Sequence, residues 1–458
     1  MSGYHFCNIK CKYNNDYKDP HVLTIIGLLI IISIVTLLMM GKTSPIIAMS
    51  VIPLIGALVA GYSFTEISTF FELGIKKVSS VATMFLFAIL FFSIMKDLHI
   101  FNPLIRMMIS ITRGNVIIVC IVTALVAAVV HLDGSGAATF LIIIPAFLPL
   151  YRRLGMSPYL MLLIMCTSMG VMNMVPWGGP LGRASAVTGI SAAELWQKII
   201  PVQIIGIFGS MLFAAVMGVR ETKRIAKAKL KGTTPYEQDS LLRQFDEDQP
   251  ETGTEKPQKF WINLLLIIGS ITCLALGLFS APYIFMVALS AALVINYPKP
   301  KDQIAIINHH APQALSMVAI ILAAGAFLGI MSNGKMLEAI ALDLAAVLPS
   351  HWVDNLHIVV GILGVPMDIF TSTDAYYFAL LPIVQEVTAS GGVHVADVVY
   401  AMAIGNNAGT FVSPFSPAAW LAMGLAGTDM GKHLRYSFGW IWLFSFFTLG
   451  VGTLLGLF

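Results

Sequence analysis

Polar side chains interrupt the apolar sequence within residues 131–180, and their types suit the binding of ions and anions. Asp133, Gly134, Ser135 and Gly136 form a polar tip between two apolar runs. The carboxylate could bind a metal or coupling cation or carry a coupled proton, and the glycines let backbone amides approach a ligand. The alternative role for Asp133 and Ser135 is to cap the helix that follows.

A second interruption follows in the same stretch. The apolar run after the tip breaks at Asn173, and residues 176–180 read PWGGP. Irregular backbone at membrane depth is tolerated only where it is buried in protein or lines a cavity. Asn173, Gly178 and Gly179 are therefore candidates to bind a ligand, with hydrogen bonding between helices as the alternative for Asn173. Arg183, after the break, could pair with a substrate carboxylate or face water.

The same pattern recurs in the second half of the chain. A shift of 237 positions aligns Ser135 with Ser372 and Pro180 with Pro417 without a gap. Paired broken segments in two halves indicate a transporter binding site. The candidates of the second half are Ser372, Thr373 and Asp374 at the tip and Asn406, Asn407 and Thr410 in the broken helix.

Asp133 and Asp374 are the chief candidates for ion coupling. An ionised aspartate at the bilayer centre costs ~2.5–3.5 kcal/mol, so such a residue is a functional candidate by default. Each could carry the coupling proton or cation, and each could contact a metal ion that enters bound to substrate. Asp368 is expected to be a helix cap or a rim residue. His131 is expected to be structural, with a proton relay as the alternative.

Composition indicates a membrane protein. The chain has 458 residues, of which 57% are hydrophobic and 11% charged, whereas a soluble domain has about 25% charged residues. The net charge of +3 gives no case for a nucleic-acid partner. No ATP-binding GxxxxGK[ST] motif is present, so a primary pump is unsupported. His5, Cys7 and Cys11 are expected to belong to an unremarkable tail, with metal binding as the alternative.

The order of apolar segments predicts an all-α polytopic membrane protein with two inverted repeats. Each repeat should contain about five transmembrane helices, a re-entrant hairpin and a broken helix. The expected divisions are a polar tail (1–20), a first repeat (21–218), a charged cytoplasmic linker (219–259) and a second repeat (260–458). Segment 138–150 has about 13 residues, too few to cross a bilayer, which favours the hairpin. The positive-inside rule places the linker in the cytoplasm, and His309 and His310 are expected in a loop.

Four segments carry a resemblance to a known family: HLDGSGAATFLIIIPAFLPLYRRLGMS, MNMVPWGGPLGRA, TSTDAYYFALLPIVQE and SPAAWLAMGLAGTDMGKH. They resemble the citrate–divalent-metal:proton symporters, the CitMHS family of the ion-transporter superfamily. The resemblance implies a scaffold domain and a transport domain in which hairpin tips and unwound helices hold carboxylates and coupling ions. The positions carried over are Asp133, Gly134, Ser135, Gly136, Asn173, residues 176–180, Ser372, Thr373, Asp374, Asn406, Asn407, Gly409 and Thr410.

The expected function is therefore uptake of citrate as a complex with Mg²⁺ or Ca²⁺, coupled to protons, by elevator-type alternating access in the plasma membrane. The metal would be a co-substrate and H⁺ the coupling ion, with no permanently bound cofactor and no enzyme activity. Neither tip has the Ser-Asn-Thr triplet of sodium-coupled dicarboxylate carriers, which favours protons over sodium. The expected partners are the citrate–metal complex and the lipid bilayer, and a homodimer remains an option.

Three alternatives stay open at this point. The nearest is a proton- or sodium-coupled carrier of another organic anion, such as a dicarboxylate or gluconate, on the same fold. An intramembrane aspartyl protease would use Asp133 and Asp374 as paired carboxylates. A channel would show flux that does not saturate.

Overall fold

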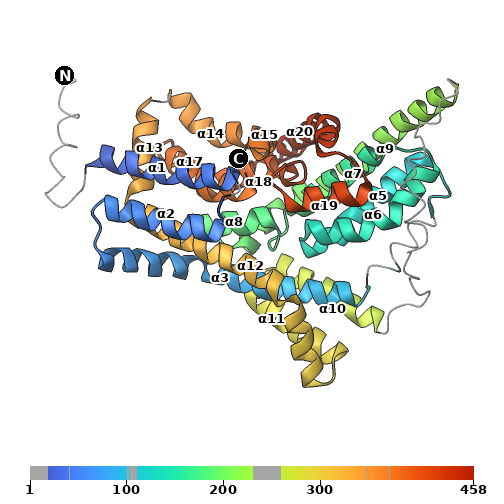
Figure 1. The fold of residues 1–458 in the computed structure, drawn as a ribbon, viewed down its shortest axis with the longest axis horizontal. Coiled ribbons are helices and arrows are strands. Elements are labelled where there is room, and N and C mark those ends of the chain that lie inside the picture. The colour runs from blue at the N-terminus through green and yellow to red at the C-terminus, as the bar shows by residue number, and fades with distance from the viewer. Residues whose placement is uncertain are drawn as a thin grey trace.

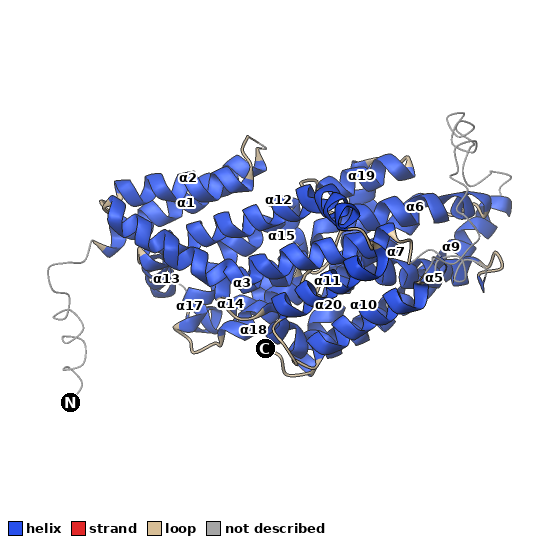
Figure 2. Ribbon diagram, turned by 90° about the horizontal axis from the view of Figure 1, so that it is seen from below, coloured by secondary structure: helices blue, strands red, loops and turns tan. Residues whose placement is uncertain are grey.

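The computed structural model describes residues 19–40, 42–100, 103, 111–230, 259–347, 349–370 and 372–458. Within these residues every regular element is a helix (Figures 1 and 2). The predicted tail, with His5, Cys7 and Cys11, lies outside the described residues, as do residues 231–258 of the predicted linker. The predicted all-α fold class is confirmed.

The helices fall into two series. The first series is α1 (Pro20–Met39), α2 (Pro45–Val59), α3 (Phe64–Asp97), α5 (Val116–Val130), η1 (His131–Asp133), α6 (Gly136–Arg153), α7 (Pro158–Met172), α8 (Gly179–Thr188) and α9 (Ala192–Leu230). The second series is α10 (Phe260–Ala275), α11 (Ala281–Asn296), α12 (Pro300–Asn333), α13 (Met336–Val347), α14 (Ser350–Ile362), α15 (Gly364–Phe370), α16 (Thr373–Ala375), the π-helix η3 (Tyr376–Leu380), α17 (Leu381–Ala389), α18 (Val395–Gly405), η4 (Gly409–Phe411), α19 (Pro417–Ala426) and α20 (Met430–Leu454).

Several helices of the two series match in length. Helices α3 and α12 have 34 residues each, and α8 and α19 have 10 residues each. The same capping bond starts both hairpin arms: Ser135 accepts from the backbone N–H of Ala138, and Ser372 accepts from that of Ala375. The internal duplication is therefore present in the local geometry as well as in the order of segments.

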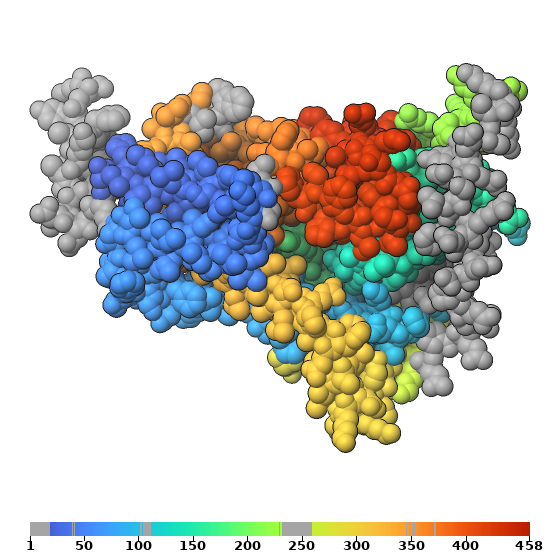
Figure 3. Space-filling model, in the orientation of Figure 1, coloured from blue at the N-terminus to red at the C-terminus, as the bar shows by residue number. Residues whose placement is uncertain are grey.

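The corresponding helices α3 and α12 run in opposite directions. Helices α3 and α12 lie side by side (Figures 1 and 3). The Tyr62 hydroxyl, just before α3, donates to the Gly334 carbonyl at 2.8 Å, just after α12. At the other end, Asp97 Oδ2 lies 2.8 Å from His310 Nε2. An antiparallel pair of equivalent helices is what an inverted repeat requires.

Glycine allows the backbones of α3 and α12 to touch. A Cβ atom added at Gly74 would clash with the Gly325 carbonyl oxygen, which belongs to the rigid backbone of α12. Close approach through small residues is a common way for helices to associate in membranes, where burial of apolar surface gives little driving force. Gly74 thus fixes the contact between the two repeats.

We expect Gly74→Ala to lower the thermal stability of the detergent-purified protein by about 1–3 kcal/mol because overpacking forces the helices apart. The control is Gly439→Ala in α20, where a Cβ atom meets nothing within 4 Å. There the better helix propensity of alanine should raise stability or leave it unchanged. Equal melting temperatures for the two variants in a thermal unfolding assay would contradict this reading of the α3–α12 contact.

In the part of the chain that the structure describes, six helices are long and apolar enough to cross a bilayer, and there are seven if two helices bent by 67° count as one span. They are Pro20–Leu38, Phe64–Asp97, Val116–Asp133, Ala192–Ala228, Pro300–Asn333 and Met430–Leu454, with Val353–Ile362 plus Gly364–Phe370 as the bent pair. Shorter apolar helices of 10–17 residues lie among them. The chain is a multi-pass membrane protein.

Two helices joined by a turn form where the first re-entrant hairpin was predicted, but the length argument for re-entry was wrong. Helix α6 has 18 residues, not about 13, because the Ser135 cap starts it earlier and Arg152 and Arg153 extend its end, where cations suit the helix dipole. The turn instead depends on Gly134, whose φ of 71° lies in the left-handed region. Helices α5 and α6 pack against each other after this turn.

Two further boundaries differ from the prediction. Helix α9 continues to Leu230, so the predicted linker begins as a continuation of this helix. In this extension Glu221 is only 3% exposed, because it accepts from the Ser157 backbone N–H at 2.7 Å and pairs with Arg224. The prediction of a loop at His309 and His310 was also wrong, since α12 begins at Pro300 and contains both residues.

Candidate functional site: a cavity between the two repeats

A cavity of about 230 Å³ lies where hairpin tips and broken helices of both repeats meet α3 and α12. Pockets for drug-sized ligands run from ~300 to 1,000 Å³, so this volume suits a small ligand. The lining residues are Phe85, Ile89, Asp133, Gly134, Ser135, Gly136, Asn173, Trp177, Gly179, Pro180, Arg183, Gln313, Met317, Thr373, Thr410, Phe411, Ser416 and Ala418.

Most of the predicted site residues meet at this cavity, although they come from two halves of the sequence. Those that line it are Asp133, Ser135, Gly136, Asn173, Gly179, Thr373 and Thr410. Those that do not are Gly178, Ser372, Asp374, Asn406 and Asn407. The roles of all of these residues in binding or coupling stay predictions.

Four helices begin at the cavity. The hairpin arms α6 and α16 begin at Gly136 and Thr373, and α8 begins at Gly179. Helix α19 begins beside Ser416 and Ala418, which line the cavity. The start of a helix carries free N–H groups and about half a positive charge, so convergent helix starts form a site for anions.

The two repeats leave different helix starts open. Ser135 and Ser372 cap the hairpin arms α6 and α16. Among the described residues, no side chain caps α8 or α19. Pro180 and Pro417 have no N–H, so the first backbone N–H groups that a ligand could meet are those of Gly179 in α8 and Ala418 in α19. Gly178, which does not line the cavity, is the N-cap residue of α8.

Arg183 adds a full positive charge at the start of α8. Its guanidinium folds back so closely over Gly179 that a Cβ atom there would lie 2.5 Å from it. Arg183 Nε donates to Asp374 Oδ1 at 2.6 Å, and the two side chains are 13% and 18% exposed. This ion pair joins the broken helix of one repeat to the hairpin tip of the other. The sequence left the role of Arg183 open, because its partner lies 191 residues away.

Of the described residues that line the cavity, Asp133 alone carries a carboxylate. Its Oδ1 accepts from the Ser135 backbone N–H at 2.8 Å, so it also shapes the tip. The second carboxylate oxygen has no such role in the turn. The side chain that caps α6 is that of Ser135, whereas Asp133 shapes the turn and lines the cavity.

Two contacts hold the first tip in place. Trp177 Nε1 donates to the Leu132 carbonyl at 2.7 Å, which joins the broken helix to the tip. His131 is fully buried, and its Nδ1 lies 2.9 Å from Thr139 Oγ1. These contacts agree with the structural role expected for His131.

We expect Trp177→Phe to lower stability by about 0.5–1.5 kcal/mol through loss of one hydrogen bond and also to raise the apparent KM for substrate, because the tip is released. Trp442→Phe is a matched control. Trp442 Nε1 in α20 also donates to a backbone carbonyl at 2.8 Å, that of Ile362 in α14, and Trp442 does not line the cavity. An uptake assay should show a changed KM only for Trp177→Phe, and an unchanged KM in both variants would remove Trp177 from substrate binding.

Asp368 forms a second polar cluster behind the second tip. Its side chain is fully buried, so the prediction of a rim residue was wrong. Thr373 Oγ1 donates to it at 3.4 Å, and its carboxylate lies against Gly409 beside the Asn406 amide. The shift of 237 positions places Asp368 opposite His131. This alignment with a residue of the first tip is the sequence signal that could have identified Asp368 as a site candidate.

The two asparagines of the second broken helix face the protein interior. Asn406 Nδ2 donates to the Gly364 carbonyl at 2.8 Å, and Asn407 Nδ2 donates to Thr448 Oγ1 at 3.4 Å. Both side chains are at most 1% exposed. For these two asparagines the geometry favours hydrogen bonding between helices over ligand binding.

The chain matches the family model CitMHS, described as citrate transporter, over residues 20–405. It belongs to the CitMHS family of citrate transporters. A "Citrate transporter" of Bacillus subtilis (strain 168) is 33% identical over 92% of this chain and 95% of the relative. A "Mg(2+)/citrate complex secondary transporter" of the same organism is 31% identical over 95% of this chain and 99% of the relative.

The fold also matches a solved structure. The YdaH transporter of Alcanivorax borkumensis, described as having an unusual topology, superposes with a TM-score of 0.58. The two are 16% identical, and the match covers 86% of this chain and 88% of that one. Membership of the CitMHS family makes the chain a transporter and not an enzyme. The protease alternative is therefore dropped, and in this chain Asp374 pairs with Arg183.

Proposed function

We propose that the protein takes up citrate as a complex with a divalent cation, in symport with protons. The observation that carries this proposal is the convergence of four helix starts and Arg183 on one cavity that holds a single carboxylate. The names of two relatives, a citrate transporter and a Mg²⁺/citrate complex transporter, support the choice of substrate.

The charge of the substrate favours the complex over free citrate. Free citrate carries about three negative charges, and each costs about 2.3 kcal/mol per 100 mV when it moves into a negative interior. Chelation of Mg²⁺ or Ca²⁺ leaves about one negative charge. Symport of two or more protons then reverses the sign of the voltage term.

The cavity has a face for each end of such a complex. The open helix starts of α8 and α19 and the Arg183 guanidinium would hold the free carboxylate. Asp133, with the Asn173 and Thr410 side chains, offers oxygen atoms to the metal side. Mg²⁺ and Ca²⁺ prefer oxygen ligands, and citrate supplies most of them.

Asp133 and Asp368 are the carboxylates we assign to proton coupling. Asp133 lies in the cavity, where its charge acts directly on the substrate. Asp368 is fully buried behind the second tip, where an ionised carboxylate without a counter-cation is costly. Protonation of Asp368 would therefore stabilise the second tip. Asp374, predicted to couple ions, is engaged with Arg183 and would instead set the position of that guanidinium.

For transport, we propose that the hairpins and broken helices move against α3 and α12. These two helices present Phe85, Ile89 and Met317, with Gln313, to the cavity. Because this wall is mainly apolar, it makes few hydrogen bonds to the hairpins and broken helices. These elements can therefore slide along α3 and α12 while few hydrogen bonds break. The proposal also places the protein in the plasma membrane and the charged segment after α9 in the cytoplasm.

A binding measurement tests the substrate. Melting temperatures of the purified protein would be recorded with Mg²⁺ plus citrate, with citrate plus EDTA and with Mg²⁺ alone. A ligand at 100 times its Kd stabilises by about 2.7 kcal/mol, so a clear upward shift is expected only for Mg²⁺ plus citrate. An equal shift for citrate with EDTA would show that free citrate is the ligand.

The homodimer is a separate prediction, which native mass spectrometry of the purified protein would check.

A further inference from the structure

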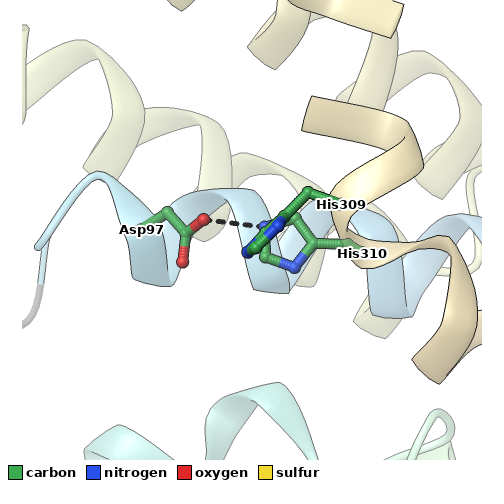
Figure 4. Close-up of side chains that lie close together, drawn as sticks. All are labelled: Asp97, His309 and His310. Carbon is green, nitrogen blue, oxygen red and sulfur yellow. Dashed lines mark hydrogen bonds and ion pairs between the residues drawn. The ribbon is translucent and has the colours of Figure 1, made fainter. Parts of the chain in front are cut away.

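Three side chains with metal-binding atoms converge where α3 and α12 cross, outside the cavity described above. They are Asp97, the last residue of α3, and His309 and His310 of α12 (Figure 4). One ligand atom from each lies within 4.8 Å of the others. Asp97 Oδ2 lies 2.8 Å from His310 Nε2, and the two imidazole rings are 4.8 Å apart between centroids. Asp97 and His309 are exposed, so an ion can reach them from water.

The donor set is wrong for Mg²⁺ or Ca²⁺ and right for a transition metal. Hard cations take oxygen ligands, whereas imidazole suits Zn²⁺, Ni²⁺ and Cu²⁺. Two imidazole nitrogens and one carboxylate oxygen give three protein ligands and leave a position for water or a further ligand. Zinc bonds of ~2.0–2.1 Å require ligand atoms about 3.3 Å apart, which rotation of the exposed Asp97 and His309 side chains can supply.

We propose that Asp97, His309 and His310 bind a divalent transition-metal ion such as Zn²⁺. The ion ties the end of α3 in the first repeat to α12 in the second. When the ion binds, it replaces the direct 2.8 Å contact between Asp97 Oδ2 and His310 Nε2. The site is separate from the citrate cavity, and its occupancy does not depend on the substrate proposed above.

The site lies close enough to the cavity to influence it. Gln313, which lines the cavity, follows His309 by four residues on α12, and residues four apart lie on the same helix face. Ile89, which also lines the cavity, precedes Asp97 by eight residues, about two turns of α3. A bound ion would therefore fix the two helices that form the cavity wall.

Zinc binding to the purified, EDTA-treated protein in the absence of citrate tests the proposal. All variants carry Cys7→Ser and Cys11→Ser, because the tail residues His5, Cys7 and Cys11 could bind zinc by themselves. Titration against a zinc-sensitive dye gives the affinity and stoichiometry, and Co²⁺ absorption reports the ligand geometry. The melting temperature with and without Zn²⁺ gives a second readout.

We expect one zinc ion per chain, a higher melting temperature with Zn²⁺ and no competition from excess Mg²⁺. The His309→Gln/His310→Gln variant should lose at least 100-fold in affinity, and the milder Asp97→Asn about tenfold. His394→Gln, at an exposed histidine that starts α18, should bind zinc as before. Absence of zinc binding, or equal binding by the double variant, would overturn the proposal and leave the citrate site untouched.

Discussion

Arg183→Gln is expected to reduce citrate uptake about 100-fold or more while the protein still inserts into the membrane. The change removes the full positive charge from the cavity and leaves Asp374, 18% exposed, without its partner at 2.6 Å. Truncating one member of a buried charge pair costs about 2–5 kcal/mol in binding, which corresponds to ~30-fold to several thousand-fold. Initial rates in proteoliposomes at several substrate concentrations would measure the loss.

Three further variants separate substrate binding from ion pairing. Asp374→Asn should also impair uptake, since Arg183 loses the contact that orients it. The double variant Arg183→Gln/Asp374→Asn should recover stability but not uptake, because no buried charge is left alone. Arg224→Gln breaks a 2.7 Å ion pair with Glu221 outside the cavity and should transport normally. Recovery of uptake in the double variant would mean that Arg183 does not touch substrate.

The second large effect on citrate uptake is expected from substitution of Asp368. Asp368→Asn mimics the protonated carboxyl in its fully buried place, where Thr373 donates to it at 3.4 Å. Accumulation driven by a proton gradient should fall to the background level, because the side chain can no longer release a proton. Exchange of external for internal citrate, which needs no net proton movement, should continue. Both modes are measured with labelled citrate in the same vesicles.

Asp133→Asn provides the contrast. Asp133 lies in the cavity and would face the metal side of the substrate, so its loss should impair exchange as well as accumulation. Melting temperatures and size-exclusion profiles would show that both variants are folded. If Asp368→Asn accumulates citrate normally, the carboxylate has no part in coupling, and if both variants lose exchange, Asp368 acts in binding instead.

The sequence predicted those parts of the site that depend on local pattern. Ser135, which lines the cavity, and Ser372, which caps the second hairpin arm, were singled out because a polar tip between apolar runs is visible in one stretch and recurs after 237 residues. The repeat also predicted that both halves contribute to one cavity, which Asp133 and Thr373 confirm. Glycine at the turn and proline after the break signalled irregular backbone at membrane depth.

Other parts depend on contacts between distant helices, which leave no local pattern. Phe85 and Met317 line the cavity from the middle of two long apolar helices and resemble any other packing residue in the sequence. Arg183 and Asp374 meet only when the two repeats interlock. His309 and His310 were placed in a loop because their polar surroundings hid the start of α12 at Pro300.

Uptake of labelled citrate into proteoliposomes tests the central claim most directly. Vesicles with an imposed proton gradient would receive citrate with EDTA, and then with Mg²⁺, Ca²⁺, Zn²⁺ or Na⁺ added singly. We predict uptake only when the gradient is combined with a divalent ion, and collapse of the gradient by an ionophore should abolish it. Uptake of free citrate driven by Na⁺ in the presence of EDTA would contradict metal–citrate and proton symport.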